Sequence, residues 1–595
     1  YRAWLDREEA RARELPAHLR DEGLDAVAEA RKVQAQLADG LAHLLSDADA
    51  RRCFRFMNEV MADQRVQTQV ARRRAHGRDH RPGESLAEAR DAVLAGDRPH
   101  SWRTFQLAFI LMQLPLLTDP AAPKRSGDLA AAQLLFFPTG GGKTEAYLGL
   151  AAYAFAIRRL QGMLDTPDGK LDGNAGVTVL MRYTLRLLTA QQFQRATALV
   201  CAAELARRRD PGTWGAEPFR IGLWVGTDGS PKRFDEAVTQ HKRALKGGGS
   251  RLTVLQFQRC PWCGTPIDVG DVRPDADRRR IYVYCGDELG DCPFSRDGEP
   301  GDGSEAGGLP VLTVDEEIYR LAPAFVIATV DKFARLAREG EAASLFGYVA
   351  EKCERHGYVH PDYSGCSIPA GSRHPKTASY RRPVARLRPP DLIIQDELHL
   401  ISGALGTTVG LFEVAVDTLC SWRPPGSGPA RETPNPDSSA PEISAPGSPA
   451  PDSLARPLIV ASTATARNAP DQVRALYGRG VTVFPPQVLD AGATFFSRER
   501  PVSKKYPGRR YVGLSTTGVR LTTAEIRVAE VLMAAGQLLL DRDADDTAGG
   551  EAGETASGTA ADPYMTLVGY FSTTRELAGM ARYMVDDIQT ALAKG

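Results

Sequence analysis

The sequence predicts an α/β fold built on a parallel sheet, and three observations favour this class. Short apolar runs alternate with helix-like stretches from about residue 101 onward. A glycine-rich turn joins one of these runs to a long helix, and a pair of adjacent carboxylates follows another. Apolar runs of this length suit strands that are buried on both faces, and their alternation with helices indicates a parallel sheet.

Residues 1–100 precede this pattern and are predicted to form a helical N-terminal domain. They are rich in Ala, Arg, Glu and Leu with helical periodicity, and they carry almost no strand signal. The whole chain has 595 residues, which is enough for roughly three or four domains of about 150 residues each.

The sheet is predicted to form in two parts, over residues 101–250 and 310–484. Three segments interrupt the pattern: a cysteine-rich insertion over 251–309, a loop rich in Pro, Ser, Ala and Gly over 423–457, and an acidic, flexible loop over 541–562. The second of these cannot bury enough apolar surface to offset the entropy of ordering, so we expect it to be disordered. The expected strands are Leu134–Phe137, Val177–Leu180, Phe325–Ala328, Leu392–Ile394 and Leu458–Val460.

Composition excludes some partners and compartments. Lys plus Arg and Asp plus Glu number 74 each, so no global basic excess indicates a polyanion partner, and any nucleic-acid surface must be local. The chain opens without an apolar signal-peptide core, and no apolar run reaches the roughly 18 residues that a membrane helix needs. The nine cysteines suggest reduced thiols rather than a disulfide framework. We therefore expect a cytoplasmic protein.

The strongest chemical signal is the segment Phe137–Glu145, which follows an apolar run and opens a long helix. Its glycines let backbone N–H groups turn inward around a phosphate chain, and the helix N-terminus adds its positive dipole end. Lys143 is predicted to lie between the β- and γ-phosphates of ATP, and the Thr144 hydroxyl to bind Mg²⁺. The predicted nucleotide-contacting residues of this turn are Thr139, Gly140, Gly141, Gly142, Lys143, Thr144 and Glu145.

The second signal is the carboxylate pair Asp396–Glu397, which an apolar strand delivers at its C-terminal end. Ligands of α/β sheets bind at this edge. Asp396 is predicted to hold Mg²⁺, and Glu397 to orient and deprotonate the water that attacks the γ-phosphate. With Lys143, these two carboxylates are the predicted catalytic residues.

Taken together, these segments resemble the first RecA-like domain of superfamily 2 helicases. Asp396-Glu397-Leu398-His399 resembles the family's Asp-Glu-x-His box, and Ser462-Thr463-Ala464-Thr465 resembles its Ser/Thr-Ala-Thr motif. Gln106, 37 residues before Lys143, resembles the family's adenine-reading glutamine. The resemblance covers about 102–465 and implies an ATP- and Mg²⁺-dependent helicase, in which His399, Ser462, Thr463 and Thr465 couple hydrolysis to movement.

The same resemblance implies nucleic-acid contacts in two turns that follow strands. In this family, such turns touch the sugar–phosphate backbone through hydroxyl, amide and basic groups. The residues at these positions are Arg182, Thr184, Arg186, Thr329 and Lys332. Ordinary turn polarity is the alternative interpretation.

A finer resemblance is to the DrmA family, the helicase subunits of bacterial DISARM anti-phage systems. The segments Phe136–Leu150 and Gln395–Gly403 carry it. It implies a DNA translocase or helicase that acts on single-stranded DNA or on DNA with a single-stranded end. It also implies a DrmB-type partner protein and a DNA methyltransferase. An RNA helicase, or a scaffold whose nucleotide site only gates assembly, are the rival functions.

Four cysteines of the insertion have metal-ligand spacing. Cys260 and Cys263 are two residues apart with a glycine after them, as in a zinc knuckle. Cys285 and Cys292 follow, with a second spacing longer than usual. We predict a structural zinc ion in a zinc-ribbon-like insertion, because four thiolates leave no open position for water.

The remaining cysteines give weaker signals. Cys353, His356, His360 and Cys366 have ligand types that suit zinc, but their spacing is irregular, so we favour free buried thiols and surface histidines. Single cysteines in apolar stretches are predicted to be core residues. These are Cys53, Cys201 and Cys420.

Residues 485–595 resemble the beginning of a second RecA-like domain, with early strands expected at 510–514 and 565–571. In superfamily 2 helicases the second domain supplies arginines that reach the γ-phosphate. No segment here resembles that motif, so we expect this chain to bind ATP and to hydrolyse it slowly.

Overall fold

The computed structural model divides into two compact units, Tyr1–Glu499 and Arg500–Gly595, which are described separately. The structure describes residues 1–75, 84–96, 101–125, 129–138, 140–183, 186–226, 229–247, 252–296, 307–374, 379–401, 403–425, 454–463, 469–504, 506, 508–515, 517–548, 561 and 564–593.

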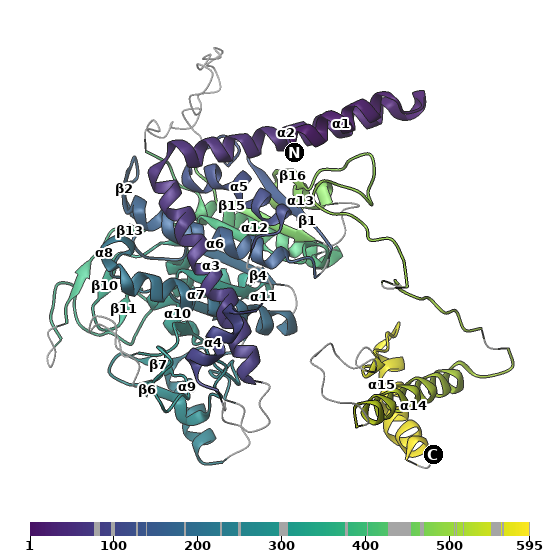
Figure 1. The fold of residues 1–595 in the computed structure, drawn as a ribbon. Coiled ribbons are helices and arrows are strands. Elements are labelled where there is room, and N and C mark those ends of the chain that lie inside the picture. The colour runs from purple at the N-terminus through teal and green to yellow at the C-terminus, as the bar shows by residue number, and fades with distance from the viewer. Residues whose placement is uncertain are drawn as a thin grey trace. The chain divides into compact units, whose positions relative to one another are not determined.

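An eight-stranded sheet lies at the centre of the first unit, and every neighbouring pair of its strands is parallel (Figure 1). This confirms the predicted α/β class with a parallel sheet, and all five predicted strands belong to it. In spatial order the strands are β16 (Gly480–Phe484), β1 (Ala131–Phe136), β15 (Leu458–Thr463), β14 (Leu392–Gln395), β4 (Val179–Tyr183), β9 (Phe325–Thr329), β5 (Ile221–Trp224) and β8 (Val311–Leu312).

Helices cover both faces of the sheet, because alternate strand residues point to opposite sides. Ile394 of β14 packs into one core with helices α5 (Thr104–Thr118), α6 (Lys143–Gln161) and α7 (Arg186–Arg209). Ile393 packs into the other core, with α10 (Asp315–Leu321), α12 (Gly403–Cys420) and α13 (Ala469–Tyr477). The three cysteines predicted to be core residues are fully buried, which confirms that prediction: Cys53, Cys201 and Cys420.

The N-terminal helices add a layer over the first of these cores. They are α1 (Arg2–Arg13), α2 (Ala17–Ser46), α3 (Ala48–Ala75) and α4 (Leu86–Leu94). Helix α3 packs against α6 and α7, and α2 packs against α5 (Figure 1). Phe56, Met57 and Val60 of α3 are buried in the same core as the sheet. Helices α2 and α3 thus share a core with the sheet.

Short elements fill the connections of the first unit. Three small sheets are present among them. The first contains β2 (Met163–Thr166), β3 (Gly169–Asp172) and β13 (Arg386–Leu387), and the second is the hairpin of β6 (Val272–Asp275) and β7 (Arg280–Val283). The third contains β10 (Glu351–Cys353), β11 (Gly357–Tyr358) and β12 (Arg381–Pro383). The short helices are α8 (Pro211–Trp214), α9 (Phe234–Leu245), η2 (Val269–Asp271), α11 (Val330–Phe333), η3 (Leu336–Arg338), η4 (Gly340–Phe346) and η5 (Leu398–Leu400).

The regular secondary structure of the described part of the second unit is helical. Its elements are α14 (Leu521–Ala548), α15 (Thr574–Tyr583), the π-helical turn η7 (Met584–Ile588) and α16 (Gln589–Leu592). The strands predicted at 510–514 and 565–571 do not form, which corrects that expectation. A strand needs a hydrogen-bonding neighbour, and within this unit the two segments do not pair with each other. Their side chains are correspondingly exposed, with Tyr511 86% and Tyr570 92% exposed.

The predicted acidic loop over 541–562 also needs a correction at its start. Helix α14 continues to Ala548, because no proline interrupts the chain between Leu521 and that point, and the single glycine, Gly536, is flanked by good helix formers. Most of the remainder, and most of the predicted loop 423–457, lies outside the described residues. Among the helices that the structure describes, none combines the length and apolar character needed to cross a bilayer.

Candidate nucleotide site and metal centres

The sheet order brings three predicted motifs to one edge. Strand β15 lies between β1 and β14, and all three run parallel. Parallel strands end at the same edge of a sheet. The glycine turn after β1, the pair Ser462–Thr463 at the end of β15 and the pair Asp396–Glu397 after β14 therefore lie next to one another.

The glycine turn has a backbone that side chains would disrupt. Gly140 and Gly142 have φ angles of 78° and 93°, in the left-handed region that favours glycine. A Cβ atom on Gly141 would lie 2.5 Å from the ring of Phe137, and one on Gly142 would lie 2.7 Å from Nε2 of Gln106. The turn thus requires glycine for space as well as for conformation. Thr139 lies outside the described residues.

Gln106 holds the glycine turn from helix α5. Its Nε2 donates to the carbonyl of Gly142 at 2.7 Å, and its Oε1 accepts from the backbone N–H of Arg103 at 2.8 Å. The Arg103 guanidinium donates to the carbonyl of Gly141 at 2.6 Å. The glutamine predicted to contact adenine is therefore bonded directly to the turn.

Lys143 lies at the first turn of α6, and its side chain is largely buried. Its ammonium donates to the carbonyl of Phe137 at 2.7 Å. Burial lowers the pKa of Lys143, and the negative charges of Glu397 and Asp396 counteract that effect. The ammonium and the two carboxylates therefore act on one another electrostatically across a shared site.

A tyrosine joins the two residues predicted to bind Mg²⁺. The hydroxyl of Tyr147 lies 2.7 Å from Oδ2 of Asp396 and 3.0 Å from Oγ1 of Thr144. The Ser462 hydroxyl donates to the other oxygen of Asp396. Among the described residues, no basic side chain forms an ion pair with Asp396. Sequence reasoning missed Tyr147, although its place one helical turn after Thr144 puts both on one face of α6.

Glu397, His399 and Thr463 form a second contact group at this edge. Nδ1 of His399 lies 3.4 Å from Oε2 of Glu397 and 3.2 Å from Oγ1 of Thr463. Glu397 itself has φ 49°, an unusual backbone conformation for a residue with a side chain. Gln472 of α13 supports the following turn by donating to the carbonyls of Leu398 and Ile401 at 2.8 Å and 2.5 Å. Thr465 lies outside the described residues.

A cavity of about 720 Å³ opens between the glycine turn and helix α3. Pockets that bind small molecules typically have volumes of about 300–1,000 Å³. Glu145, which also forms an ion pair with Arg195, contributes to its wall. No motif predicted that α3 would form one side of this cavity. The lining includes Asn58, Gln64, Thr68 and Gln69 of α3 and Trp102, Gln106, Gly140 and Gly142 near the turn.

The structure corrects the predicted nucleic-acid contacts. Arg182 is 1% exposed and forms an ion pair with Glu413, so its guanidinium is committed inside the protein. Lys332 is 5% exposed and pairs with Asp315. Thr329 is also buried. Thr184 and the side chain of Arg186 lie outside the described residues. A buried, paired cation cannot contact a phosphate backbone, so this prediction was wrong for Arg182 and Lys332.

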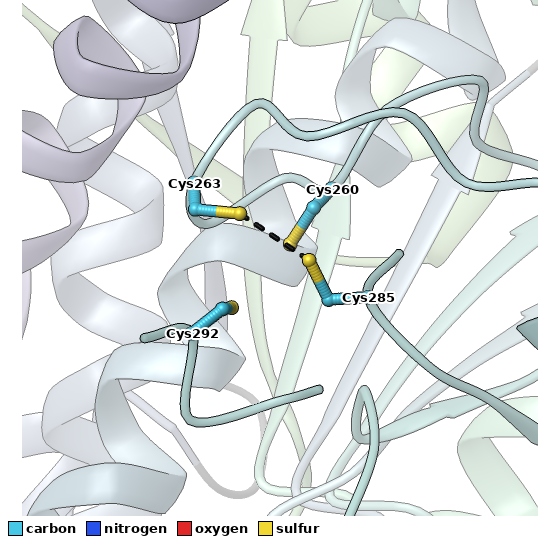
Figure 2. A group of neighbouring side chains, drawn as sticks. All are labelled: Cys260, Cys263, Cys285 and Cys292. Atoms are coloured by element: carbon cyan, nitrogen blue, oxygen red, sulfur yellow. Dashed lines mark hydrogen bonds between the residues drawn. The ribbon is translucent and has the colours of Figure 1, made fainter. Parts of the chain in front are cut away.

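The four cysteines of the insertion converge as predicted. Their sulfur atoms all lie within 4.8 Å of one another, and all four residues are buried (Figure 2). Cys263 Sγ and Cys285 Sγ are 3.3 Å apart. Burial raises the pKa of the Cys260 thiol, and a metal ion would replace the protons on these sulfurs. Four converging thiols fit zinc, and they belong to the loops on either side of the hairpin β6–β7.

A second buried group of this kind exists, and sequence reasoning identified only part of it. Cys353, His356 and Cys366 converge, but the fourth member is His374 and not His360. Nδ1 of His360 instead lies 3.5 Å from Asp362. The preference for free thiols and surface histidines is therefore corrected: both cysteines and both converging histidines are buried together.

Comparison with known proteins gives one strong similarity. No family model matches the chain. The chain is 36% identical over 555 residues to a protein named "DISARM protein DrmA" from Bacillus paralicheniformis. The alignment covers 90% of this chain and 42% of that protein, so the chain spans about two fifths of its relative's length.

Proposed function

Because the chain is a DrmA-like protein, we propose that it is an ATP-dependent DNA helicase or translocase of a DISARM-type anti-phage defence system. We further propose that the eight-stranded sheet is a RecA-like nucleotide-binding core. The name of the relative supports the defence system. The arrangement at the edge of the sheet supports the ATP-dependent chemistry.

One observation carries the nucleotide proposal: Thr144 and Asp396, from separate motifs, contact the same hydroxyl of Tyr147. Asp396 is buried and has no basic partner among the described residues. A buried carboxylate that is held by hydroxyl groups and a backbone N–H keeps a negative charge that a cation can neutralise. Both oxygen ligands suit Mg²⁺.

Each residue has a distinct role in this proposal. Backbone N–H groups of the turn Gly140–Thr144 would contact the phosphates, apart from that of Gly141, which donates to the carbonyl of Pro138 at 3.0 Å. The Lys143 ammonium, which donates to the Phe137 carbonyl, would bind the β- and γ-phosphate oxygens. Thr144 and Asp396 hold Mg²⁺, which neutralises charge on the phosphates when it is bound. Glu397 orients the attacking water and accepts its proton. The cavity beside α3 holds the base and the ribose.

Coupling and the remaining partners complete the proposal. His399 contacts both Glu397 and Thr463, and so links the water-activating carboxylate to strand β15. DNA with a single-stranded region, a DrmB-type protein and a DNA methyltransferase are the proposed partners. The four-cysteine group is proposed to hold a structural zinc ion, because its four thiolates leave no position for a reacting water.

ATP binding tests the site apart from turnover. Lys143→Ala should weaken binding of a fluorescent ATP analogue at least about tenfold, because a charge-assisted contact with the phosphates is worth about 1.5–3 kcal/mol. Lys170→Ala is the matched control, since the Lys170 side chain is 67% exposed on β3. Equal affinities of the two variants would refute the nucleotide site.

ATP hydrolysis tests the function. Turnover measured with single-stranded DNA, duplex DNA and RNA should rise with DNA, and Glu397→Gln should abolish the rise. Glu22→Gln, at an exposed position on α2, is the control. Stimulation by RNA alone would favour the RNA helicase. Full phage restriction by a complex that carries Glu397→Gln would favour the nucleotide-gated scaffold.

A further inference from the structure

We propose that the chain binds a second zinc ion through Cys353, His356, Cys366 and His374. This two-sulfur, two-nitrogen centre is separate from the four-cysteine group, shares no ligand with it and does not depend on the proposed helicase function. Its ligands come from the end of β10, the turn after it and the loop that leads to β12.

The ligand atoms are spaced as a tetrahedral zinc site requires. Zinc binds sulfur at about 2.3 Å and imidazole nitrogen at about 2.0–2.1 Å, so tetrahedral ligands stand about 3.4–3.8 Å apart. Sγ of Cys353 lies 3.6 Å from Nδ1 of His356 and 3.2 Å from Nε2 of His374. One ligand atom from each of the four residues lies within 4.8 Å of every other. A single ion at their centre would contact all four.

The histidines are prepared to act as ligands. Both are buried, with His356 7% exposed and His374 9% exposed, and their rings meet edge to face with centroids 5.1 Å apart. A neutral imidazole leaves a nitrogen lone pair free for a metal. Two buried imidazoles that point at two thiols, with no carboxylate in the group, form a donor set typical of zinc.

The segment also needs a stabilising link of this kind. Its own hydrophobic cluster contains four buried residues, two of which are the cysteines: Cys353, Val359, Tyr363 and Cys366. A core this small cannot offset the entropy of ordering a segment of roughly 30 residues, and small units commonly use metals to do so. The proposed ion therefore explains why residues 351–374 and 379–383 hold a defined fold.

The second centre also anchors the first insertion. The Arg355 guanidinium donates to the carbonyl of Asp277 at 2.6 Å, at the turn between β6 and β7. Arg320 donates to the carbonyl of His356 and, at 2.5 Å, to that of Arg279 in the same hairpin. Cys285 follows this hairpin directly. The two proposed ions would thus fix two loop regions that are bonded to each other.

Native mass spectrometry of the full chain, purified without chelator, provides the direct test. We expect a mass for two zinc ions per chain, and elemental analysis should give two equivalents. One zinc ion that disappears in Cys260→Ser and persists in Cys353→Ser would overturn the proposal. This measurement on the unaltered chain does not depend on whether any variant folds.

Variants then assign the ions. The double variant Cys353→Ser/Cys366→Ser should bind one zinc ion, whereas His360→Ala should still bind two. His360 is the matched control because it lies in the same segment but outside the converging group. His374→Cys should retain two ions, since a thiolate can replace the imidazole. Two ions in the double variant, or loss of one in His360→Ala, would contradict the assignment.

The cobalt-substituted protein adds a readout of ligand type. Cobalt bound by two sulfurs and two nitrogens absorbs at higher energy than cobalt bound by four sulfurs. The wild-type spectrum should contain both contributions, and the Cys353→Ser/Cys366→Ser variant should retain only that of the four-sulfur site. A wild-type spectrum with the four-sulfur contribution alone would count against the second centre.

Discussion

Strand β14 carries a buried aspartate at each end, and the two carboxylates are held in opposite ways. Asp391, before the strand, forms ion pairs with Arg125 and Arg158 at 3.0 Å and with Arg388 at 2.6 Å. Among the described residues, the hydrogen-bond partners of Asp396, after the strand, are hydroxyl and backbone groups, including those of Tyr147 and Ser462. Both side chains are almost fully buried.

This difference separates a structural carboxylate from one that is available for chemistry. Burial would raise the pKa of Asp391, but Arg388, Arg158 and Arg125 hold it well below its usual range. Its charge is already neutralised, and it ties α6 and the loop before β1 to the sheet. Asp396 has hydrogen bonds that fix its position, and no described basic side chain forms an ion pair with it, so its charge is available to a metal ion.

The largest expected effect is on stability. Asp391→Asn leaves three buried guanidinium groups without their counter-charge, and breaking such a pair costs about 3–5 kcal/mol. The free energy of unfolding, measured with urea at pH 7, should fall by this amount. Asp165→Asn, at a side chain that is 84% exposed, should change it by less than about 0.5 kcal/mol. A small effect of Asp391→Asn would mean that the comparison between the two ends is wrong.

Asp396→Asn should give the opposite result. Loss of the carboxylate that is proposed to bind Mg²⁺ should reduce DNA-stimulated ATP turnover by roughly a hundredfold to a thousandfold, equivalent to about 3–4 kcal/mol in the barrier. The unfolding free energy should change little, because no buried cation loses its partner. Turnover at raised Mg²⁺ concentrations and urea unfolding measure the two effects. A variant that loses stability and keeps turnover would reverse the assignment.

The pH dependence of stability should also distinguish the two ends. The pKa of Asp391 is lower in the folded chain than in the unfolded chain, so its stabilisation is complete above the ordinary Asp pKa of about 3.9 and is lost as the pH falls below that value. The difference in unfolding free energy between wild type and Asp391→Asn should therefore be constant from pH 7 to pH 5 and shrink towards pH 3. A constant difference down to pH 3 would contradict this.

The smallest effect is expected from Tyr147→Phe. This substitution removes the hydroxyl that contacts both Thr144 and Asp396. The Mg²⁺ concentration that gives half-maximal turnover should rise a few-fold, because one hydrogen bond contributes about 1 kcal/mol. Tyr153→Phe, on the same helix and also buried, is the control, because its hydroxyl bonds Thr118 outside the site. Identical Mg²⁺ titrations of the two variants would show that Tyr147 does not organise the site.

The parts of the fold that depend on local pattern were predictable. The apolar runs gave the five strands, and the glycine turn gave the start of α6. Two of the buried partners of Asp391 could not be predicted. Arg125 and Arg158 are 266 and 233 residues away from it in the sequence. Distant pairing of this kind leaves no periodic signal.

The candidate site shows the same limit. Motif spacing identified Lys143, Asp396 and the four cysteines, because each belongs to a short recognisable pattern such as the pair Cys260–Cys263. It missed His374, which is 21 residues from Cys353, and chose the nearer His360. It also assigned Arg182 and Lys332 to a surface, because a basic residue after a strand looks the same whether its partner is water or a buried Glu413 or Asp315.

The wall that α3 forms beside the glycine turn has a practical consequence. A version of the chain shortened to begin at residue 101 would retain every motif named above, yet it would leave the nucleotide cavity open on one side and expose the apolar surfaces of α6 and α7 that Phe56, Met57 and Val60 cover. Such a minimal protein should aggregate and bind ATP poorly. The motifs alone therefore do not mark the limits of the smallest active unit.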